Sequence, residues 1–234
     1  MGTDIQQLFT QIAPTYDKLN RWLSFSRDRQ WRAKAIAAAT AKLEMRVVDL
    51  CAGTLDLTVA CLKRFPHARI TAIDFSQRML DLGLKKVPHV FHAQTDLRCG
   101  DALATGLPDR SADCVMCAFG MRNLADQHRA LAEIRRLLAP EGEFVMLEFF
   151  PPETRLARLF AKTYGRFVIP ALGGLIAKNR AAYEHLRDST ASFYPLSAYR
   201  ALLAQHGFIV TRAEYLSGGI CGLIVARKSD DNFF

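Results

Sequence analysis

The sequence predicts an α/β protein built on a doubly wound, mostly parallel sheet that ends in an antiparallel hairpin. Strand-like apolar runs alternate with helix-like segments through the middle of the chain, a pattern that favours right-handed crossovers between parallel strands. A glycine-containing turn follows the first of these strands, and two strand-like runs joined at Ser217-Gly218-Gly219 close the chain. The 234 residues are 50% apolar, which is enough for one domain with a substantial core.

Two helices are expected before the sheet. Residues 5–12 carry apolar side chains at i, i+3, i+4 and i+7, so they predict a short amphipathic helix, and Pro14 is expected to end it. A longer helix, rich in Ala, Lys and Arg, is expected over about 29–43.

The strand and helix units of the sheet follow. In order, they are a strand at 45–50, a turn at Ala52-Gly53-Thr54, a helix to about Phe65, a strand at 68–74, a helix from Ser76, a strand at 113–119, a helix from Asp126 to Leu138 that Pro140 and Gly142 end, and a strand at 143–149. After a basic, partly helical segment at 153–187 come a helix at about 197–206 and strands at 208–216 and 220–228.

The net charge of +8 is distributed unevenly along the chain. Residues 1–50 carry an excess of +3, residues 51–150 are neutral, and residues 151–234 carry +5. A neutral middle argues against a nucleic-acid-binding protein, whose charge would be basic throughout the binding domain. The basic ends still fit an anionic partner at one surface.

The six cysteines are scattered through apolar contexts, which predicts reduced thiols. Cys114 and Cys117 have no second pair with which to complete a zinc site, so no metal is expected. The apolar stretch at 167–177 is too short to span a bilayer, and the first residues do not have the pattern of a secretory signal. A cytoplasmic protein is therefore expected.

The turn after the first strand is the clearest local signal for a ligand. It has the sequence Asp49-Leu-Cys-Ala-Gly53-Thr54, and Asp74 ends the next strand, 21 residues after Gly53. In doubly wound sheets a glycine turn lets the backbone approach a ligand, and an acidic residue at this distance accepts the hydroxyls of a ribose. No long phosphate-binding glycine loop is present, which favours a nucleoside cofactor without a pyrophosphate. Taken alone, the pair could equally be an ordinary turn beside a surface Asp.

Longer motifs extend this signal, and with them nearly the whole chain resembles the ubiquinone/menaquinone-biosynthesis C-methyltransferases. They are Phe9-Thr-Gln-Ile-Ala-Pro-Thr-Tyr16-Asp17-Lys-Leu-Asn20, Leu23-Ser-Phe25, Arg29-Gln-Trp31-Arg32, Leu50-Cys-Ala-Gly-Thr-Leu-Asp-Leu-Thr58, Asp74-Phe-Ser-Gln-Arg-Met-Leu80, Gly100-Asp101-Ala102, Phe119-Gly-Met-Arg122-Asn123, Leu147-Glu148-Phe149 and Ser217-Gly-Gly-Ile220. The resemblance implies the Rossmann-like fold of class I methyltransferases. It divides a single domain, 1–234, into a helical lid (1–44), a cofactor-binding core (45–150) and substrate-side helices with the hairpin (151–234).

The resemblance also implies S-adenosyl-L-methionine as the cofactor and assigns residues to it. Gly53 and Thr58 would border the methionine part, Asp74 would accept the ribose hydroxyls, Asp101 and Ala102 would flank the adenine, and Tyr16 would belong, with Asp17, to the lid. These roles fit the side chains, because a carboxylate accepts from a diol or an exocyclic amine.

The implied reaction is methylation of a ring carbon of a prenylated hydroquinone, demethylmenaquinol or a related ubiquinone precursor. The ring carbon becomes nucleophilic when an adjacent hydroxyl, whose pKa is about 10, gives up its proton. Arg122 and Asn123 are the expected catalytic residues, with Arg122 stabilising the phenolate or holding a proton-accepting water and Asn123 orienting it. An arginine is always protonated and is not itself expected to be the base.

Four positions depart from the family pattern: Ser26, Leu55, Ala118 and Ile224. Leu55 replaces a glycine of the cofactor turn, and its side chain is expected to shrink the pocket, shift the turn or abolish cofactor binding if the position needs a positive φ. This change leaves open a non-catalytic partner subunit. Ile224 replaces a histidine of the last strand, which leaves open another apolar phenolic substrate.

The basic segment predicts a peripheral contact with an anionic membrane. Residues 155–167 place apolar side chains on one helical face and Arg155, Arg158, Lys162 and Arg166 on another. A lipid-soluble quinol has to be taken from such a surface, at the inner face of the membrane. The alternative is a helix packed on its own domain, and the sequence also leaves a homodimer open.

Overall fold

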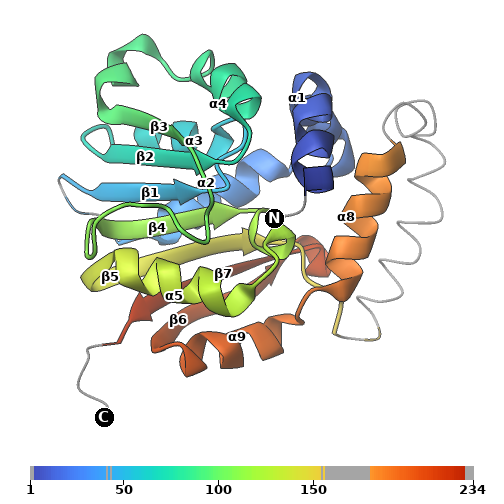
Figure 1. Cartoon of the computed structure of the whole chain (residues 1–234). Coiled ribbons are helices and arrows are strands. Elements are labelled where there is room, and N and C mark those ends of the chain that lie inside the picture. Colours follow the sequence, from blue (N-terminus) through green and yellow to red (C-terminus); the bar gives the residue numbers. More distant parts are fainter. Residues whose placement is uncertain (1–2, 41, 43, 154, 156–179, 230–234) are drawn as a thin grey trace.

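The structure, a computed structural model, describes residues 3–40, 42, 44–153, 155 and 180–229. Its centre is a seven-stranded sheet in the order β3-β2-β1-β4-β5-β7-β6 (Figure 1). The strands are β1 (Arg46–Leu50), β2 (Arg69–Asp74), β3 (Thr95–Cys99), β4 (Ala112–Ala118), β5 (Leu138–Glu148), β6 (Phe208–Leu216) and β7 (Cys221–Lys228). Strands β1 to β5 are parallel, whereas β7 is antiparallel to both β5 and β6. The predicted fold class is therefore confirmed.

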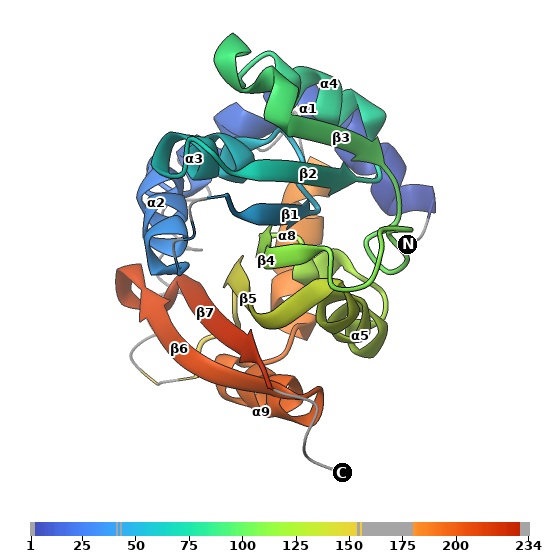
Figure 2. The ribbon, with the colours of Figure 1, turned by 90° about the vertical axis from the view of Figure 1, so that its left-hand side faces the viewer.

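Helices lie on both faces of this sheet and at the edge where its parallel strands end. They are α1 (Thr3–Leu23), α2 (Asp28–Ala38), α3 (Asp56–Arg64), α4 (Gln77–Leu84), α5 (Gln127–Leu137), α8 (Arg180–Ser192) and α9 (Leu196–Gln205), with short 3-10 turns η1 (His89–Gln94), η2 (Met121–Asn123) and η3 (Ser217–Gly219). The view in Figure 2 shows α2 and α3 on one side of the strands and α5 and α9 on the other. The boundaries expected after residues 44 and 150 fall between α2 and β1 and just after β5, but the division itself stays a prediction.

The apolar core has two layers because successive strand side chains point to opposite faces. Val47 of β1 belongs to the layer shared with α2 and α3, whereas Val48 and Leu50 belong to the layer shared with α5 and α9. All three are almost fully buried. Burial of each such side chain contributes about 1.5–3 kcal/mol, so the sequence pattern that predicts the strands also fixes which helices they pack on.

Helix α1 corrects the prediction that Pro14 ends the first helix. The helix continues through Pro14 to Leu23, and the proline ring is on its exposed side. A proline removes one backbone donor from a helix. Hydrogen bonds from residues on both sides of it to the rest of the protein hold the helix together: Gln6 donates to the Phe75 carbonyl at 2.8 Å and Asp17 accepts from Thr54 at 2.6 Å.

Other boundaries also differ from those expected. Helix α2 ends at Ala38 instead of 43, and β3 had no predicted range. Strand β5 begins at Leu138, so Pro140 and Gly142 lie within it. The pairing of β5 with β4 is interrupted between Leu138 and Glu143. Pro140 fits in this irregular stretch because no backbone N–H is needed there to donate a hydrogen bond to β4.

Helices α1 and α8 stand side by side at the edge of the sheet where the parallel strands end (Figure 1). This edge is the usual ligand-binding edge of an α/β sheet. No helix in the described part of the chain is long and apolar enough to cross a membrane. Most of the basic segment at 155–167 lies outside the described residues; only Arg155, which is exposed, is described.

Candidate active site

The turn between β1 and α3 is built from left-handed backbone conformations. Cys51, Gly53 and Leu55 have φ values of 56°, 52° and 61°. Position 55 thus does need a positive φ, as one of the sequence-based alternatives supposed, and the leucine adopts it at a cost of about 1–2 kcal/mol.

The Leu55 side chain does not point at the ligand edge. It is fully buried among α3, α4 and the neighbouring strands. Gly83 of α4 makes room for it, since a Cβ at position 83 would lie 2.4 Å from Leu55 Cγ. The leucine fills the core beneath the turn and leaves the space above it open.

Asp74 ties this turn to the next strand. Its carboxylate accepts the backbone N–H of Gly53 through Oδ2 and that of Ser76 through Oδ1, both at 2.9 Å. Burial raises the pKa of Asp74 to about 6, despite these two hydrogen bonds. Gly53 and Asp74 line a cleft of about 360 Å³, as the sequence pairing of the two residues predicts. The other residues that line it are Phe9, Tyr16, Cys51, Phe75, Met79, Ala118, Phe119, Gly120 and Asn123.

Asp49 is a residue that the sequence analysis left out of the site. With Arg32 and Gly53 it lines an adjoining cleft of about 310 Å³. Burial raises the pKa of Asp49 to about 7. Thr58, predicted to border the cofactor, is fully buried behind Asp49 and donates to its Oδ2 at 2.6 Å. Thr58 lines neither of these two clefts, and its hydrogen bond positions the Asp49 carboxylate.

Asp101 and Ala102 follow β3, one strand over from Asp74. The Gly100 N–H donates to the Asp74 carbonyl at 3.0 Å, which holds the start of this segment beside β2. Asp101 is exposed and accepts the Leu103 N–H at 2.9 Å, whereas Ala102 is buried. Neither residue lines the two clefts described above, and their contact with the adenine stays a prediction.

Helix α1 covers these clefts from one side. Tyr16 lines both of them, and burial raises the pKa of its phenol, so it stays protonated. Asp17 accepts from Thr54 and pairs with Lys86, whose Nζ lies 2.9 Å from Asp17 Oδ2. The same Nζ contacts Asp56 Oδ1 at 2.5 Å. We call Thr54, Asp17, Lys86 and Asp56 the lid clamp, because it fastens α1 to the cofactor turn.

A third cleft, of about 460 Å³, is more apolar and lies between α1, α8 and the ends of β4 and β5. It shares Phe9, Tyr16 and Phe119 with the cleft above Asp74. Its other lining residues are Leu8, Ile12, Asn20, Arg122, Phe149, Ala182, His185 and Leu186. A bulky apolar molecule placed here would contact the ligand of the Asp74 cleft directly.

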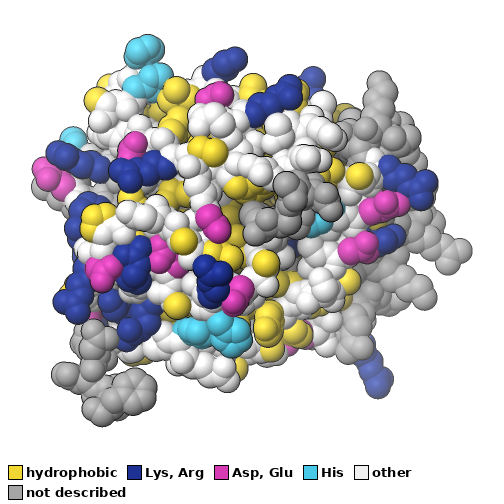
Figure 3. Space-filling model, viewed as in Figure 1, with side chains coloured by type: hydrophobic (Ala, Val, Ile, Leu, Met, Phe, Trp, Pro, Cys, Tyr) yellow, Lys and Arg dark blue, Asp and Glu magenta, His cyan; other side chains and the backbone are white. Residues whose placement is uncertain are grey.

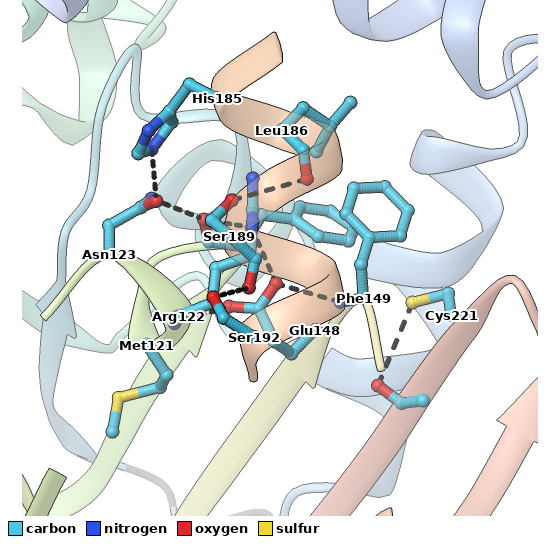
Figure 4. Close-up of polar contacts among 12 residues, drawn as sticks. Met121, Arg122, Asn123, Glu148, Phe149, His185, Leu186, Ser189, Ser192 and Cys221 are labelled. Atoms are coloured by element: carbon cyan, nitrogen blue, oxygen red, sulfur yellow. Dashed lines mark hydrogen bonds and ion pairs between the residues drawn. The ribbon is translucent and has the colours of Figure 1, made fainter. Parts of the chain in front are cut away.

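Arg122 is held at the end of this apolar cleft by Glu148 (Figure 4). Its Nη1 lies 2.6 Å from Glu148 Oε1 and 2.7 Å from the Phe119 carbonyl, and its guanidinium lies 5.4 Å from the centre of the Phe149 ring. Both charged side chains are buried, at 6% and 0% exposed. Among the described residues, Arg122 Nε has no hydrogen-bond partner. Glu148, which the sequence analysis quoted only as part of a motif, thus neutralises the predicted catalytic arginine.

Asn123 connects the two sides of the site. Its Nδ2 donates to the Phe119 carbonyl at 3.3 Å, and its Oδ1 lies 2.9 Å from His185 Nε2 (Figure 4). Sequence analysis missed His185, because none of the motifs that carry the resemblance covers α8. Ile224 is fully buried in the sheet opposite Met146 and lines none of these described clefts.

Comparisons with known proteins identify the same family as the sequence motifs. The family model described as the ubiE/COQ5 methyltransferase family matches residues 2–228. The chain belongs to this family. It is an S-adenosylmethionine-dependent methyltransferase, and the predicted family, activity and cofactor are confirmed.

Relatives of this methyltransferase are named demethylmenaquinone methyltransferase. The one from Thermus thermophilus is 40% identical over 94% of this chain and 100% of its own length. The one from Deinococcus radiodurans is 40% identical over 97% of this chain and 93% of its own length, and the one from Staphylococcus haemolyticus is 33% identical over 96% and 93%.

Solved structures support the fold of the methyltransferase. A chain in the complex of the Haloferax volcanii Trm112 methyltransferase activator with a methyltransferase matches with a TM-score of 0.71 and 17% identity, over 95% of this chain and 98% of that one. An S-adenosylmethionine-dependent methyltransferase from Aquifex aeolicus matches with a TM-score of 0.61 and 17% identity, over 90% and 97%. The class I methyltransferase fold is thereby confirmed.

Proposed function

We propose that this methyltransferase transfers a methyl group to a ring carbon of demethylmenaquinol or a closely related prenylated hydroquinone. The observation that carries the proposal is the pair of adjoining clefts, one that contains the Asp74 carboxylate and one that is apolar, which share Phe9, Tyr16 and Phe119. The names of the relatives point to the same class of substrate.

The residues of the Asp74 cleft and of the adjoining Asp49 cleft fit S-adenosylmethionine. The buried Asp74 carboxylate, whose hydrogen bonds come from backbone N–H groups, suits the two hydroxyls of a ribose. Asp49 and Arg32 line the neighbouring cleft and carry opposite charges, which suits the ammonium and carboxylate of a methionine. Asp101 and Ala102 are proposed to flank the adenine. When bound there, the cofactor supplies the methyl group from its sulfonium.

The chain's own contribution to the reaction is to orient the two molecules and to assist one deprotonation. The Arg122 guanidinium is already paired with Glu148, so its net effect on a phenolate is smaller than that of an isolated cation. The Arg122 guanidinium, which lines the apolar cleft, is the group we assign to the developing negative charge on the ring oxygen.

Two other functions are less consistent with the site. A non-catalytic partner subunit would follow if Leu55 obstructed the cofactor turn, but its side chain points into the core. A differently shaped phenolic substrate would follow if position 224 faced the substrate, but Ile224 is buried in the sheet. Both observations favour the quinol.

The experiment is methylation of reduced demethylmenaquinone by the purified chain with S-adenosylmethionine, followed by mass spectrometry. We expect product only with the reduced substrate, because the quinone has no hydroxyl proton to give up. Calorimetric titration with S-adenosylhomocysteine runs alongside it. Binding of S-adenosylhomocysteine without methylation of the quinol would contradict the proposed substrate. No binding of S-adenosylhomocysteine at millimolar concentration would contradict methyltransferase activity.

We also propose that the protein approaches an anionic membrane through the end of α1. Trp22 and Phe25 are 58% and 63% exposed there. Four exposed cations lie in the same stretch without an ion-pair partner among the described residues: Lys18, Arg21, Arg27 and Arg29. Exposed aromatic side chains beside cations are typical of surfaces that bind anionic lipid headgroups. Asn20, in the same stretch, lines the apolar cleft, so a lipid-tailed quinol would enter near the membrane.

Co-sedimentation with vesicles tests this surface. We expect binding to phosphatidylglycerol vesicles at low salt that weakens at high salt, and weaker binding still for the double variant Trp22→Ala, Phe25→Ala. Val90→Ala, at a 78% exposed position on η1, is the matched control and should bind as the parent does. Equal binding of the double variant and the parent would contradict the proposed surface.

We do not propose nucleic acid as a substrate or partner. On the face shown in Figure 3, basic and acidic side chains are intermingled outside the grey atoms, without the single-sign patch that a polyanion needs. Self-association into a homodimer stays a prediction, which sedimentation at micromolar concentration checks.

A further inference from the structure

His185 lies where the apolar cleft adjoins the cleft above Asp74. It projects from α8 into the lining of the apolar cleft, and its Nε2 lies 2.9 Å from Asn123 Oδ1 (Figure 4). Asn123 in turn lines the cleft above Asp74. The Phe9 ring lies edge-on to the imidazole, with centroids 5.9 Å apart. The imidazole is therefore a titratable group at the place where two bound molecules would meet.

The hydrogen bonds of Asn123 fix which imidazole nitrogen carries the proton. Its Nδ2 faces the Phe119 carbonyl, which is only an acceptor, so its Oδ1 must face His185. An amide oxygen accepts, and His185 Nε2 is then the donor. The Nδ1 atom keeps the lone pair, and among the described residues it has no hydrogen-bond partner.

The charges around His185 keep the ring neutral. Burial lowers its pKa from the usual 6.5, and the nearby Arg122 cation lowers it further, while Asp188 on the same helix acts in the opposite direction. Glu148 is paired with Arg122, and Tyr16, which lines the same cleft from α1, stays protonated. A neutral imidazole with one free nitrogen is a competent proton acceptor at neutral pH.

We propose that His185 Nδ1 accepts the hydroxyl proton of the bound hydroquinone, with Asn123 as the positioning residue that holds the imidazole in the reactive tautomer. This inference rests on the proposed function and names the proton acceptor within it.

The step balances as follows. The O–H bond breaks, its proton goes to Nδ1, and its electron pair enters the ring. The ring carbon then bonds to the methyl group, and the electron pair of the broken sulfur–methyl bond stays on sulfur. The imidazolium returns its proton to the ring oxygen while the ring carbon releases its hydrogen to solvent water as a proton. One proton is released for each methyl group transferred.

The kinetic test compares pH profiles at saturating cofactor. For the parent protein we expect kcat to fall with decreasing pH through the lowered pKa of His185, because the protonated ring cannot accept. His185→Gln should lower kcat by about 100-fold or more and abolish this acid limb, since general bases contribute about 10²–10⁴. Added imidazole should partly rescue His185→Ala.

A matched control is His206→Gln. His206 also has a pKa lowered by burial and also contacts another side chain, His128, but it lies at the end of α9 and lines none of the described clefts. It should keep the parent's kcat and profile. If His185→Gln kept kcat within twofold with the same acid limb while binding cofactor normally, the proposal would be overturned.

A measurement without substrate or cofactor separates the proposal from the proposed function. Nitrogen-15 spectra of the free protein should show His185 as the Nε2-protonated tautomer, and Asn123→Ala should shift it toward a mixture. An Nδ1-protonated ring in the parent would overturn the assignment of the proton acceptor even if the quinol is methylated. A parent protein that methylates no quinol, with the expected tautomer present, would instead overturn the proposed function.

Discussion

Leu55 and Gly83 form one packing unit beneath the cofactor turn. The leucine has a left-handed backbone and a fully buried side chain that occupies the space a Cβ at position 83 would need. We expect Leu55→Gly to relieve the backbone strain but to leave a cavity, with a net loss of about 2–3 kcal/mol in the free energy of unfolding. Urea denaturation measures the loss, and calorimetry should show cofactor binding that is unchanged or weaker.

The control for this prediction is a double-mutant cycle with Gly83→Ala. Alone, the alanine should destabilise by about 1–3 kcal/mol, because its Cβ would lie 2.4 Å from Leu55 Cγ. In combination with Leu55→Gly the two losses should be less than additive by about 1 kcal/mol. Additive losses would contradict the packing of Leu55 against Gly83. Tighter cofactor binding by Leu55→Gly would show that the leucine obstructs the turn.

The buried Arg122–Glu148 ion pair leads to a second prediction about stability. Glu148→Ala leaves the guanidinium in an apolar surrounding without its partner, so we expect a loss of about 3–5 kcal/mol in the free energy of unfolding. Glu148→Gln keeps an acceptor for Arg122 and should lose less. Thermal and urea unfolding at pH 7 check both variants, and equal stability of Glu148→Ala and the parent would contradict a buried ion pair.

Individual site residues were predictable where the signal was local. Gly53 and Asp74 follow two adjacent strands, so the spacing of the motif was enough to bring them together. Asp49 and Thr58 are nine residues apart, and the sequence motif assigned a role to Thr58 alone. Packing brings Asp49 to the cleft, with Thr58 hydrogen-bonded behind it. His185 is 62 residues from Asn123, and no periodicity in the chain connects the two.

The lid clamp holds helix α1 against the turn between β1 and α3, where we propose that it acts as a lid. Lys86 pairs with Asp17 of α1 and with Asp56 at the start of α3, so one ammonium bridges the lid and the cofactor turn. We expect Lys86→Met to weaken S-adenosylhomocysteine binding by about 10-fold. In this variant the lid is no longer held in place, and ordering it on binding reduces the affinity. The free energy of unfolding should change by less than 1 kcal/mol, since the pairs are partly exposed.

Lys85→Met is the matched control for the clamp. Lys85 is the neighbouring residue and is exposed, and no contact joins it to the lid within the described part of the chain. Calorimetric affinity for Lys85→Met should equal that of the parent, and the deficit of Lys86→Met should shrink at 1 M salt, where the parent's ion pairs are screened. Equal affinities for the two variants would exclude the clamp.

Elements were predictable where apolar periodicity marked them. The two strands of the hairpin were predicted almost to the residue. In both, apolar side chains either alternate with polar ones or follow one another, and a glycine turn separates the strands. Strand β3 was not predicted, since most of its side chains are at least partly exposed and its sequence, Thr-Asp-Leu-Arg-Cys, is polar. The course of α1 through Pro14 depends on tertiary hydrogen bonds that no local rule contains.

The two buried carboxyls at the ligand edge make cofactor affinity depend on pH across the physiological range. Burial raises the pKa of Asp49 to about 7 and that of Asp74 to about 6, so each is protonated in the folded protein as the pH falls through that value. In the proposed cofactor site both carboxyls act as acceptors. We therefore expect the affinity for S-adenosylhomocysteine to fall from pH 8 to pH 5, first near pH 7 and more steeply below pH 6, as measured by calorimetry.

Asp74→Asn provides the control for this pH dependence. An asparagine still offers one acceptor oxygen but does not titrate, so its affinity should be lower and the additional steepening below pH 6 should disappear. The dependence near pH 7 should remain, because it belongs to Asp49. A parent affinity that is constant between pH 5 and pH 8 would contradict the role of both carboxyls.

Tyr16 lines all three clefts, and this shared wall has a thermodynamic consequence. A side chain that contacts two ligands at once makes the binding of each sensitive to the other. Any factor by which bound quinol raises the affinity for the cofactor must equal the factor by which bound cofactor raises the affinity for the quinol. Part of this coupling would pass through the phenol ring, so Tyr16→Ala should reduce the factor, while the shared residues Phe9 and Phe119 keep the rest.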